Sequence, residues 1–466
     1  MKQLKFVLWV VYMKKILFFC GIYILVLIQG LSVAAGKTDG GNVVFSSNTV
    51  AEVTAEPATI KESELFSQGA VLMDASSGRV LYGKNQDLQL AMASTTKIMT
   101  CIVALEHGGL EDVVTASAYA AAQPKVKLYL NKGEQVLLKD LLYSLMLESH
   151  NDSAVAIAEH IGAELLGLST DMESVTKRTD AESKEAVAAF IKCMNEKASE
   201  LQCYNTWFIT PNGLDGTETF YSEDGVEAEK FHSTTAAELA RIMSYCILQS
   251  PGKDAFLEIT GTYSYNFTNL EKTRSFVCQN HNAFLNMMDG AISGKTGYTG
   301  RAGYCYVGAL ERDGRYFVVA LLNSGAYGSG NKGRKWQDTK KLMSFGIEHF
   351  NIKNIYEGKT LTEPVIVQNA KPEIGEYYEA QKVETVVSGD KPVDMLLADW
   401  ENAEVTVVQE EILTAPVRKG QIVGAVEVKL NGTIIEHFDI VCTEEIAVKT
   451  FEDTLYYMLH TFLLMK

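Results

Sequence analysis

The chain has 466 residues, 47% of them hydrophobic, which is enough to build two or three domains with buried cores. Lys and Arg together number 42 against 58 Asp and Glu, and the net charge of −16 disfavours nucleic acid as a partner. The 8 cysteines and 8 histidines are dispersed without zinc-type spacing, so we expect no metal, no cofactor and no complete disulfide framework.

The N-terminal region has the layout of a secretory signal peptide. Lysines precede an apolar run from Ile16 to Ile28, and small residues follow from Ser32 to Gly36. Met13, just before two of these lysines, offers a second possible start. We therefore predict a signal peptide over residues 1–35, an unpatterned linker over residues 36–61 and an exported, extracytoplasmic protein. An uncleaved N-terminal membrane anchor is the alternative.

The folded part is expected to begin with a strand hairpin that leads into a helix. Two apolar stretches, Gly69–Asp74 and Arg79–Tyr82, flank a Ser-Ser-Gly turn. Further on, Ser94 stands three residues before Lys97 at the start of an apolar helix that stops at Gly108. A serine and a lysine on one helix face form a nucleophile with its own base. Taken alone, the pair is also compatible with an exposed helix cap and a solvated lysine.

A short break between two predicted helices, Gln135–Met146 and Asp152–Ile161, carries Ser149 and Asn151. Helices this apolar should hold the break against the core, so that a hydroxyl and a carboxamide project from one turn. The alternative is that Asn151 or Asp152 only caps the second helix.

The middle of the chain is predicted to be mainly helical. Residues Leu166–Glu185 are rich in charge and indicate a surface loop or a helical insertion. Helices are expected at Phe190–Leu201 and Ser233–Leu248, the second capped by Ser233 or Thr234. The residues between them, 206–215, are too rich in turn formers for a regular element.

The stretch from Lys295 to Tyr298 comes directly before two strong strands, Tyr304–Leu310 and Tyr316–Leu322, and a helix at Lys335–Phe350. The strands are joined by a short polar turn and should be antiparallel neighbours in one central sheet. Helices and an antiparallel sheet together predict an α+β domain over residues 62–350.

The composition changes after Ile352. Short runs rich in Val, Ile and Thr predict a small all-β sandwich over residues 351–446. Residues 447–466 predict an amphipathic helix that is too short and too charged to span a bilayer. We expect it to attach the protein to a membrane surface, with docking on the β domain or dimerisation as the alternatives. Its apolar stripe consists of Leu455, Met458, Leu459, Phe462 and Met465.

Three short motifs are much more specific in combination than each is alone. Ser94-x-x-Lys97, Ser149-x-Asn151 and Lys295-Thr296-Gly297 occur in the order typical of class A β-lactamases and penicillin-binding proteins. Residues 66–350 also resemble the low-molecular-mass penicillin-binding proteins that are serine-type D-alanyl-D-alanine carboxypeptidases. The likeness is carried by the stretches 93–100, 151–159, 210–215 and 295–299, and by 413–416 and 420–424 in the β domain. One departure is Met92, where the family usually has proline.

The resemblance implies a β-lactamase/transpeptidase-like catalytic domain and a defined reaction. Ser94 would attack the carbonyl between two terminal D-alanines of a peptidoglycan stem peptide and form an acyl-enzyme, with neutral Lys97 as its base. Penicillins would acylate the same serine. Ser149 would relay a proton to the leaving amine. Asn151 would hydrogen-bond the substrate backbone.

The remaining residues implied by the resemblance bind the end of the substrate. Backbone N–H groups of Ser94 and Tyr298 would hold the oxyanion, and Lys295 and Thr296 would face the terminal carboxylate. Gly297 completes this strand motif. The family also places an arginine near the start of the last catalytic-domain helix. Its best match in this chain is Lys335, or Arg334 beside it.

Two other classes of protein share these motifs. A class A-like β-lactamase would need a glutamate-directed water for deacylation and has no evident use for a β domain and an amphipathic tail. A non-hydrolytic penicillin-binding sensor or scaffold would stop at the acyl-enzyme. Release of D-alanine from a peptide separates both classes from a carboxypeptidase.

Overall fold

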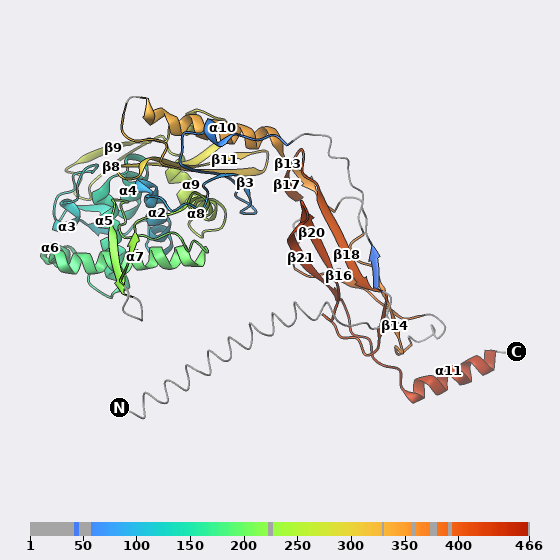
Figure 1. Cartoon of the computed structure of the whole chain (residues 1–466). Coiled ribbons are helices and arrows are strands. Elements are labelled where there is room, and N and C mark those ends of the chain that lie inside the picture. Colours follow the sequence, from blue (N-terminus) through green and yellow to red (C-terminus); the bar gives the residue numbers. More distant parts are fainter. Residues whose placement is uncertain are drawn as a thin grey trace. The chain divides into compact units, whose positions relative to one another are not determined.

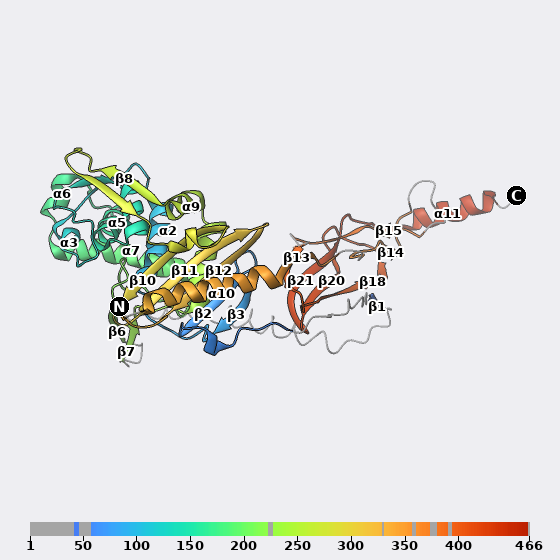
Figure 2. The same cartoon turned by 90° about the horizontal axis from the view of Figure 1, so that it is seen from above.

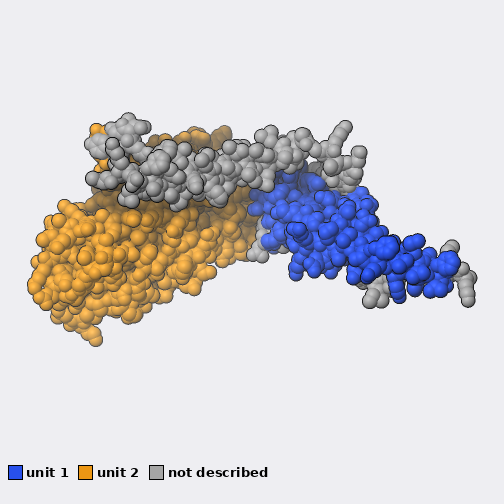
Figure 3. Space-filling model, turned by 90° about the horizontal axis from the view of Figure 1, so that it is seen from below, with its two compact units in different colours: residues 1–53, 354–394, 401–466 blue, residues 54–353, 395–400 orange. Residues whose placement is uncertain are grey.

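The computed structural model divides the chain into two compact units (Figure 3). Unit 2 comprises residues 54–353 and 395–400, and unit 1 comprises residues 1–53, 354–394 and 401–466. The described residues are 42–45, 57–221, 227–328, 330–356, 360–372, 380–389 and 394–464. The predicted signal peptide over residues 1–35 lies outside them, as does most of the predicted linker. Within that linker, Asn42–Phe45 form strand β1.

A five-stranded antiparallel sheet forms the centre of unit 2, with the order β10-β11-β12-β2-β3. Both predicted strand pairs are therefore confirmed. Residues 75–79 join the β2–β3 pair, and a two-residue turn joins β11 to β12. The strands are β10 (Ala291–Thr299), β11 (Gly303–Arg312), β12 (Arg315–Leu322), β2 (Gly69–Asp74) and β3 (Val80–Lys84).

Both faces of this sheet are buried, which explains why its strands are almost continuously apolar. Along β12, Phe317 and every second residue after it pack in one core together with Leu342 of helix α10. Val318 and every second residue after it belong to the core on the other face of the sheet. Figure 1 shows α10 on one side of the sheet and helices α8 and α9 on the other. These helices are α10 (Arg334–His349), α8 (Ala236–Leu248) and α9 (Lys253–Gly261).

The remaining helices of unit 2 gather on the side of α8 and α9, and α2 lies at their centre (Figures 1 and 2). They are α2 (Lys97–His107), α3 (Ala118–Ala121), α4 (Leu138–Tyr143), α5 (Asn151–Leu165), α6 (Met172–Lys177) and α7 (Asp180–Glu200). Three two-stranded ribbons also belong to the unit: β4 (Val113–Thr115) with β5 (Gln135–Leu137), β6 (Thr217–Tyr221) with β7 (Glu227–Phe231), and β8 (Ser264–Thr268) with β9 (Ser275–Gln279).

Several predicted helix boundaries are wrong. The helix predicted from Gln135 begins as strand β5, continues as α4 and ends in a π-helical turn, Ser144–Glu148. Helix α7 begins well before the predicted Phe190, because Thr179 and Glu182 form a reciprocal capping box. The region predicted to be a surface loop or a helical insertion, Leu166–Glu185, holds α6 and the start of α7, in agreement with the second alternative.

A further correction concerns the N-terminal cap of α8. The cap is Thr235, and neither Ser233 nor Thr234 fills that position. Thr235 has the extended backbone and the hydroxyl contact to the Glu238 N–H that a cap requires.

The described residues of unit 1 are all-β apart from the helix at their C-terminal end, as the sequence predicts. Its larger sheet has the order β1-β18-β20-β21-β16, and a smaller sheet has the order β15-β14-β19. Buried and exposed side chains alternate along β18, where Val405 and Val407 face inward and Glu404 is exposed. The strands are β14 (Val365–Gln368), β15 (Lys382–Val383), β16 (Thr385–Val387), β18 (Ala403–Glu410), β19 (Ile412–Thr414), β20 (Ile422–Leu430) and β21 (Thr433–Cys442).

Two further elements follow α10 in the chain: a strand whose residues 395–398 belong to unit 2, and the terminal helix of unit 1. Strand β17 (Asp394–Ala398) pairs with β13 (Phe350–Asn354), and Leu396 and Ala398 belong to the core beneath α10. Helix α11 (Phe451–Leu464) ends the described chain. Among the described residues, no helix has the length and apolar character needed to cross a membrane.

Candidate active site

Ser94 lies in a tight 3-10 turn, Ala93–Thr96, that leads directly into α2. Ala93 has a left-handed backbone (φ 49°), and the Thr95 and Thr96 hydroxyls donate to the carbonyls of Met92 and Ala93 at 2.7 and 2.8 Å. These contacts fix the turn that presents the half-buried Ser94. The sequence placed Ser94 in the helix itself, whereas the helix begins at Lys97.

Lys97 is fully buried at the first position of α2. Its Nζ lies 3.0 Å from Ser94 Oγ and donates to Asn151 Oδ1 at 2.9 Å and to the Asn212 carbonyl. Burial, reinforced by the nearby charge of Lys295, holds the Lys97 pKa well below the usual lysine value. The structure therefore brings the predicted serine and lysine into direct contact.

Ser149 and Asn151 lie on the turn between the π-helical segment and α5. Ser149 has a left-handed backbone (φ 68°), and its buried Oγ has no hydrogen-bond partner among the described residues. Asn151 Nδ2 donates to the Pro124 carbonyl at 3.1 Å, which turns Oδ1 toward Lys97. The alternative that Asn151 or Asp152 caps α5 is not supported, because α5 has no side-chain cap and Asp152 accepts two loop N–H groups.

The strand motif runs along the other side of Ser94 on β10. A Cβ on Gly297 would come within 2.9 Å of Ser94 N and 3.0 Å of Thr95 N, so only glycine allows this close passage. Lys295 is buried, and its Nζ donates to the Thr296 carbonyl at 3.2 Å. Burial lowers the Lys295 pKa to about 7, against an opposing effect of the Glu148 carboxylate.

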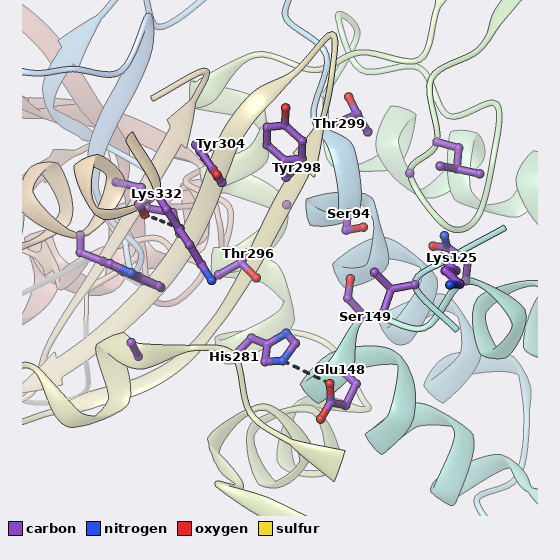
Figure 4. A pocket seen from close by; sticks show the side chains of 18 residues that line it. Ser94, Lys125, Glu148, Ser149, His281, Thr296, Tyr298, Thr299, Tyr304 and Lys332 are labelled. Carbon is purple, nitrogen blue, oxygen red and sulfur yellow. Dashed lines mark hydrogen bonds and ion pairs between the residues drawn. The ribbon is translucent and has the colours of Figure 1, made fainter. Parts of the chain in front are cut away.

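A cavity of about 550 Å³ opens in front of these groups. Figure 4 shows Ser94 and Ser149 on one side of it and Thr296 and Tyr298 across from them. Lys97 and Lys295 are buried behind its wall. Of the predicted residues, those that line the cavity are Ser94, Ser149, Asn151, Thr296, Gly297 and Tyr298.

The structure also separates the two candidate cations on α10. Lys335 lines the cavity, is 3% exposed and packs over the rings of Tyr304 and Trp336. Burial lowers its pKa to about 8. The Arg334 guanidinium lies over the ring of Phe66, and Arg334 is not part of the cavity wall.

Sequence reasoning missed several residues that shape the site. His232 accepts the Ile209 N–H at its Nδ1 (2.9 Å), so its Nε2 is left to donate to Thr96 Oγ1 (2.7 Å). Burial lowers the pKa of this imidazole to about 3, which keeps it neutral. A lone histidine carries no local sequence signal. The Asn212 contact to Lys97 could have been sought in the turn-rich stretch that contains it.

A contact between a carboxylate and an imidazole at the cavity wall was also missed. Glu148 and His281 approach to 3.1 Å, and the second Glu148 oxygen accepts the Gln279 N–H at 2.8 Å (Figure 4). Both carboxylate oxygens are thus engaged. Glu148 is the one acidic side chain among the described residues that line this cavity.

The fold and the site define a serine enzyme of the penicillin-binding, acyl-transfer type. The family described as D-alanyl-D-alanine carboxypeptidase matches residues 53–174 and 183–325, and the C-terminal domain of penicillin-binding protein 5 matches residues 362–448. The chain therefore belongs to the D-alanyl-D-alanine carboxypeptidase family, the serine hydrolases among the low-molecular-mass penicillin-binding proteins. The predicted fold class and enzyme class are confirmed.

Curated relatives agree with this assignment at modest identity. D-alanyl-D-alanine carboxypeptidase DacF of Bacillus subtilis is 26% identical over 81% of this chain and 85% of its own length. DacC of Escherichia coli is 27% identical over 83% of this chain and 86% of its own length. The crystal structure of DacD from Francisella tularensis covers 85% of this chain and 96% of its own, with a TM-score of 0.58 and 22% identity, and supports the fold.

Proposed function

We propose that this enzyme removes the terminal D-alanine from peptidoglycan stem peptides through an acyl-enzyme on Ser94. The observation that carries the proposal is the set of acceptors around Lys97. A neutral amine has two N–H bonds, and Asn151 Oδ1 and the Asn212 carbonyl accept them. The amine lone pair is then left for the Ser94 hydroxyl at 3.0 Å. This is the arrangement that a general base requires.

The steps follow from that arrangement. Ser94 Oγ attacks the carbonyl carbon of the penultimate D-alanine while Lys97 takes the hydroxyl proton. The backbone N–H groups of Ser94 and Tyr298 hold the oxyanion. The C–N bond to the last D-alanine breaks, and Ser149, whose Oγ has no hydrogen-bond partner among the residues that the structure describes, relays a proton to the leaving amine. Water then hydrolyses the ester and restores Ser94.

Binding of the substrate's terminal carboxylate is assigned to Thr296, Lys295 and Lys335. Thr296 and Lys335 line the cavity, and Lys295 lies directly behind Thr296. Lys335 occupies the position of the family's arginine. A compact ammonium charge therefore replaces a planar guanidinium that could bind a carboxylate through two parallel hydrogen bonds. We infer from its place in the wall that Lys335, and not Arg334, fills this role.

The β-lactamase alternative needs a carboxylate that directs a water at the ester. Glu148 is the one acidic side chain among the described residues that line the cavity, and it already accepts the Gln279 N–H and contacts His281. These contacts hold the carboxylate in place and disfavour that role. We therefore expect penicillins to acylate Ser94 and to be released slowly.

A purified, signal-free chain tests this function. We expect stoichiometric release of D-alanine from a peptide that ends in D-Ala-D-Ala, faster than hydrolysis of penicillin under the same conditions. Faster penicillin hydrolysis would favour the β-lactamase. Acylation by penicillin without any D-alanine release would favour the sensor.

We further propose export, by the N-terminal segment, and membrane-surface attachment through α11. The large apolar side chains of this helix remain open to solvent, with Phe462 80%, Met458 62% and Leu459 55% exposed. Such exposure argues against docking on the strands of unit 1 and favours a partner outside the chain. An apolar stripe of this kind suits reversible insertion into the bilayer interface. Met465 of the predicted stripe lies outside the described residues.

A further inference from the structure

A second cluster of chemically active side chains lies on α5, among residues that do not line the catalytic cavity. His160 and Glu164 are one helical turn apart and share a face of α5, and Asp112 lies in the segment that precedes β4. The ligand-type atoms of these three side chains all lie within 4.8 Å of one another. The topology therefore brings an imidazole and two carboxylates together from two separate elements.

The imidazole of His160 is the unusual member of this cluster. The residue is only 7% exposed, and its Nε2 is buried without a hydrogen-bond partner among the described residues. Glu164 Oε1 lies 3.5 Å from Nε2, which is longer than an N–H···O hydrogen bond. A buried nitrogen without a partner is costly, so an unpartnered imidazole in a cluster with two carboxylates needs an explanation.

We propose that Asp112, His160 and Glu164 bind a zinc ion. Two carboxylates and a neutral imidazole balance the charge of Zn²⁺, and nitrogen with oxygen donors suits this metal better than Mg²⁺ or Ca²⁺, which prefer oxygen alone. Three protein ligands leave a fourth tetrahedral position for water. The nearby cation Arg178 does not oppose binding strongly, because Glu159 pairs with it at 2.9 Å.

The spacing of the three side chains is compatible with this metal. Atoms that are no more than 4.8 Å apart place a central ion at most about 2.8 Å from each, against about 2.0–2.2 Å in a zinc site. The difference is less than about 1 Å per ligand. Glu164, whose side chain is 43% exposed, can close it by a change of rotamer without moving the backbone.

The expected role of the ion is structural. It would join α5 to the segment that connects α2, which ends at His107, with β4, which begins at Val113. Because α2 starts with Lys97 and α5 starts with Asn151, the ion would brace the two helices that carry the base and its partner. None of the three ligands lines the catalytic cavity, so the reaction itself does not need the ion.

The test compares thermal unfolding of the metal-free, tag-free chain with and without ZnCl₂, together with titration calorimetry. At a hundredfold excess over Kd, binding to the native state should raise the melting temperature by about 5 °C, with one zinc bound per chain. Glu164→Gln, which alters an exposed side chain, should lose most of this shift, and so should His160→Gln. Glu111→Gln, next to Asp112 and also exposed, is the matched control and should keep it.

The proposal has definite contrary outcomes. An unchanged melting temperature in the unaltered chain would overturn it. A zinc-dependent shift that persists in Glu164→Gln and in His160→Gln would also overturn it, because the ion would then bind elsewhere. If His160→Gln fails to fold, Glu164→Gln still decides the question.

Discussion

Three buried lysines lie at the catalytic cavity, and their environments separate their roles. Lys97 is held by two carbonyl acceptors and contacts Ser94, and its depressed pKa suits the proton transfer that we propose for it. Lys295 and Lys335 have pKa values lowered to about 7 and about 8 by burial, so near neutral pH they exchange between charged and neutral forms. In the proposed mechanism the charge of Lys295 and Lys335 binds the substrate carboxylate, whereas Lys97 acts in its neutral form.

This division predicts how the kinetics depend on pH. Between pH 7 and 9 the free enzyme loses protons from Lys295 and Lys335. The KM for a peptide with a free carboxylate should therefore rise about tenfold, whereas kcat should stay constant. As the pH is lowered, kcat should fall once Lys97 gains a proton, because only the neutral amine can act as the base. Initial rates across this range measure both constants.

Lys335→Arg offers the control for this profile, because a guanidinium stays charged throughout. The rise of KM between pH 8 and 9 should be smaller in this variant. An identical KM profile in both proteins would show that Lys335 does not bind the carboxylate.

At the scale of elements, the contact between α5 and α7 is set by one small residue. A Cβ on Gly162 would lie 1.8 Å from the Ala186 carbonyl oxygen, so the two helices could not approach as they do. Gly162→Ala should destabilise unit 2 by about 1–3 kcal/mol, although alanine is the better helix former. The temperature of half-inactivation of D-alanine release should drop by about 5 °C.

The matched control is Gly300→Ala, because a Cβ there meets nothing within 4 Å. This variant should inactivate at the same temperature as the unaltered chain. Equal stability of the two variants would mean that α5 and α7 can separate at no cost, contrary to the packing described here.

Sequence patterns predicted those elements whose signals are local. The β2–β3 hairpin, β11, β12 and α10 follow from apolar runs and turn residues, and the three motifs identified Ser94, Ser149 and Lys295. The contacts that complete the site depend on tertiary structure. His232 reaches Thr96 across more than a hundred residues, and Glu148 meets His281 in the same way. No spacing rule connects such pairs.

At the scale of the whole molecule, one departure concerns where the chain divides. The sequence assigns residues 351–446 to a single β domain, whereas residues 395–400 belong to unit 2. Strand β17 carries Leu396 and Ala398 into the core beneath α10, beside Phe350. Its apolar run has the same character as the strands of unit 1, so composition alone could not separate them.

The proposed membrane attachment is tested on the signal-free chain. A chain that ends at Thr450 should stay active on small peptides but lose sedimentation with phospholipid vesicles. The full-length double variant Leu459→Glu and Phe462→Glu should behave in the same way, because both side chains are largely exposed on α11. Vesicle binding that survives both changes would exclude α11 as the anchor. A change from dimer to monomer without altered vesicle binding would favour the dimer alternative.

The central claim is that Ser94 forms the acyl-enzyme, and mass spectrometry of the penicillin-treated protein tests it most directly. We expect one penicilloyl group per chain, located by peptide mapping on Ser94. Ser94→Ala should show no adduct and no D-alanine release. Ser76→Ala, an exposed serine of the β2–β3 turn, should label like the unaltered chain. An adduct on another residue, or labelling of Ser94→Ala at the normal rate, would contradict the account.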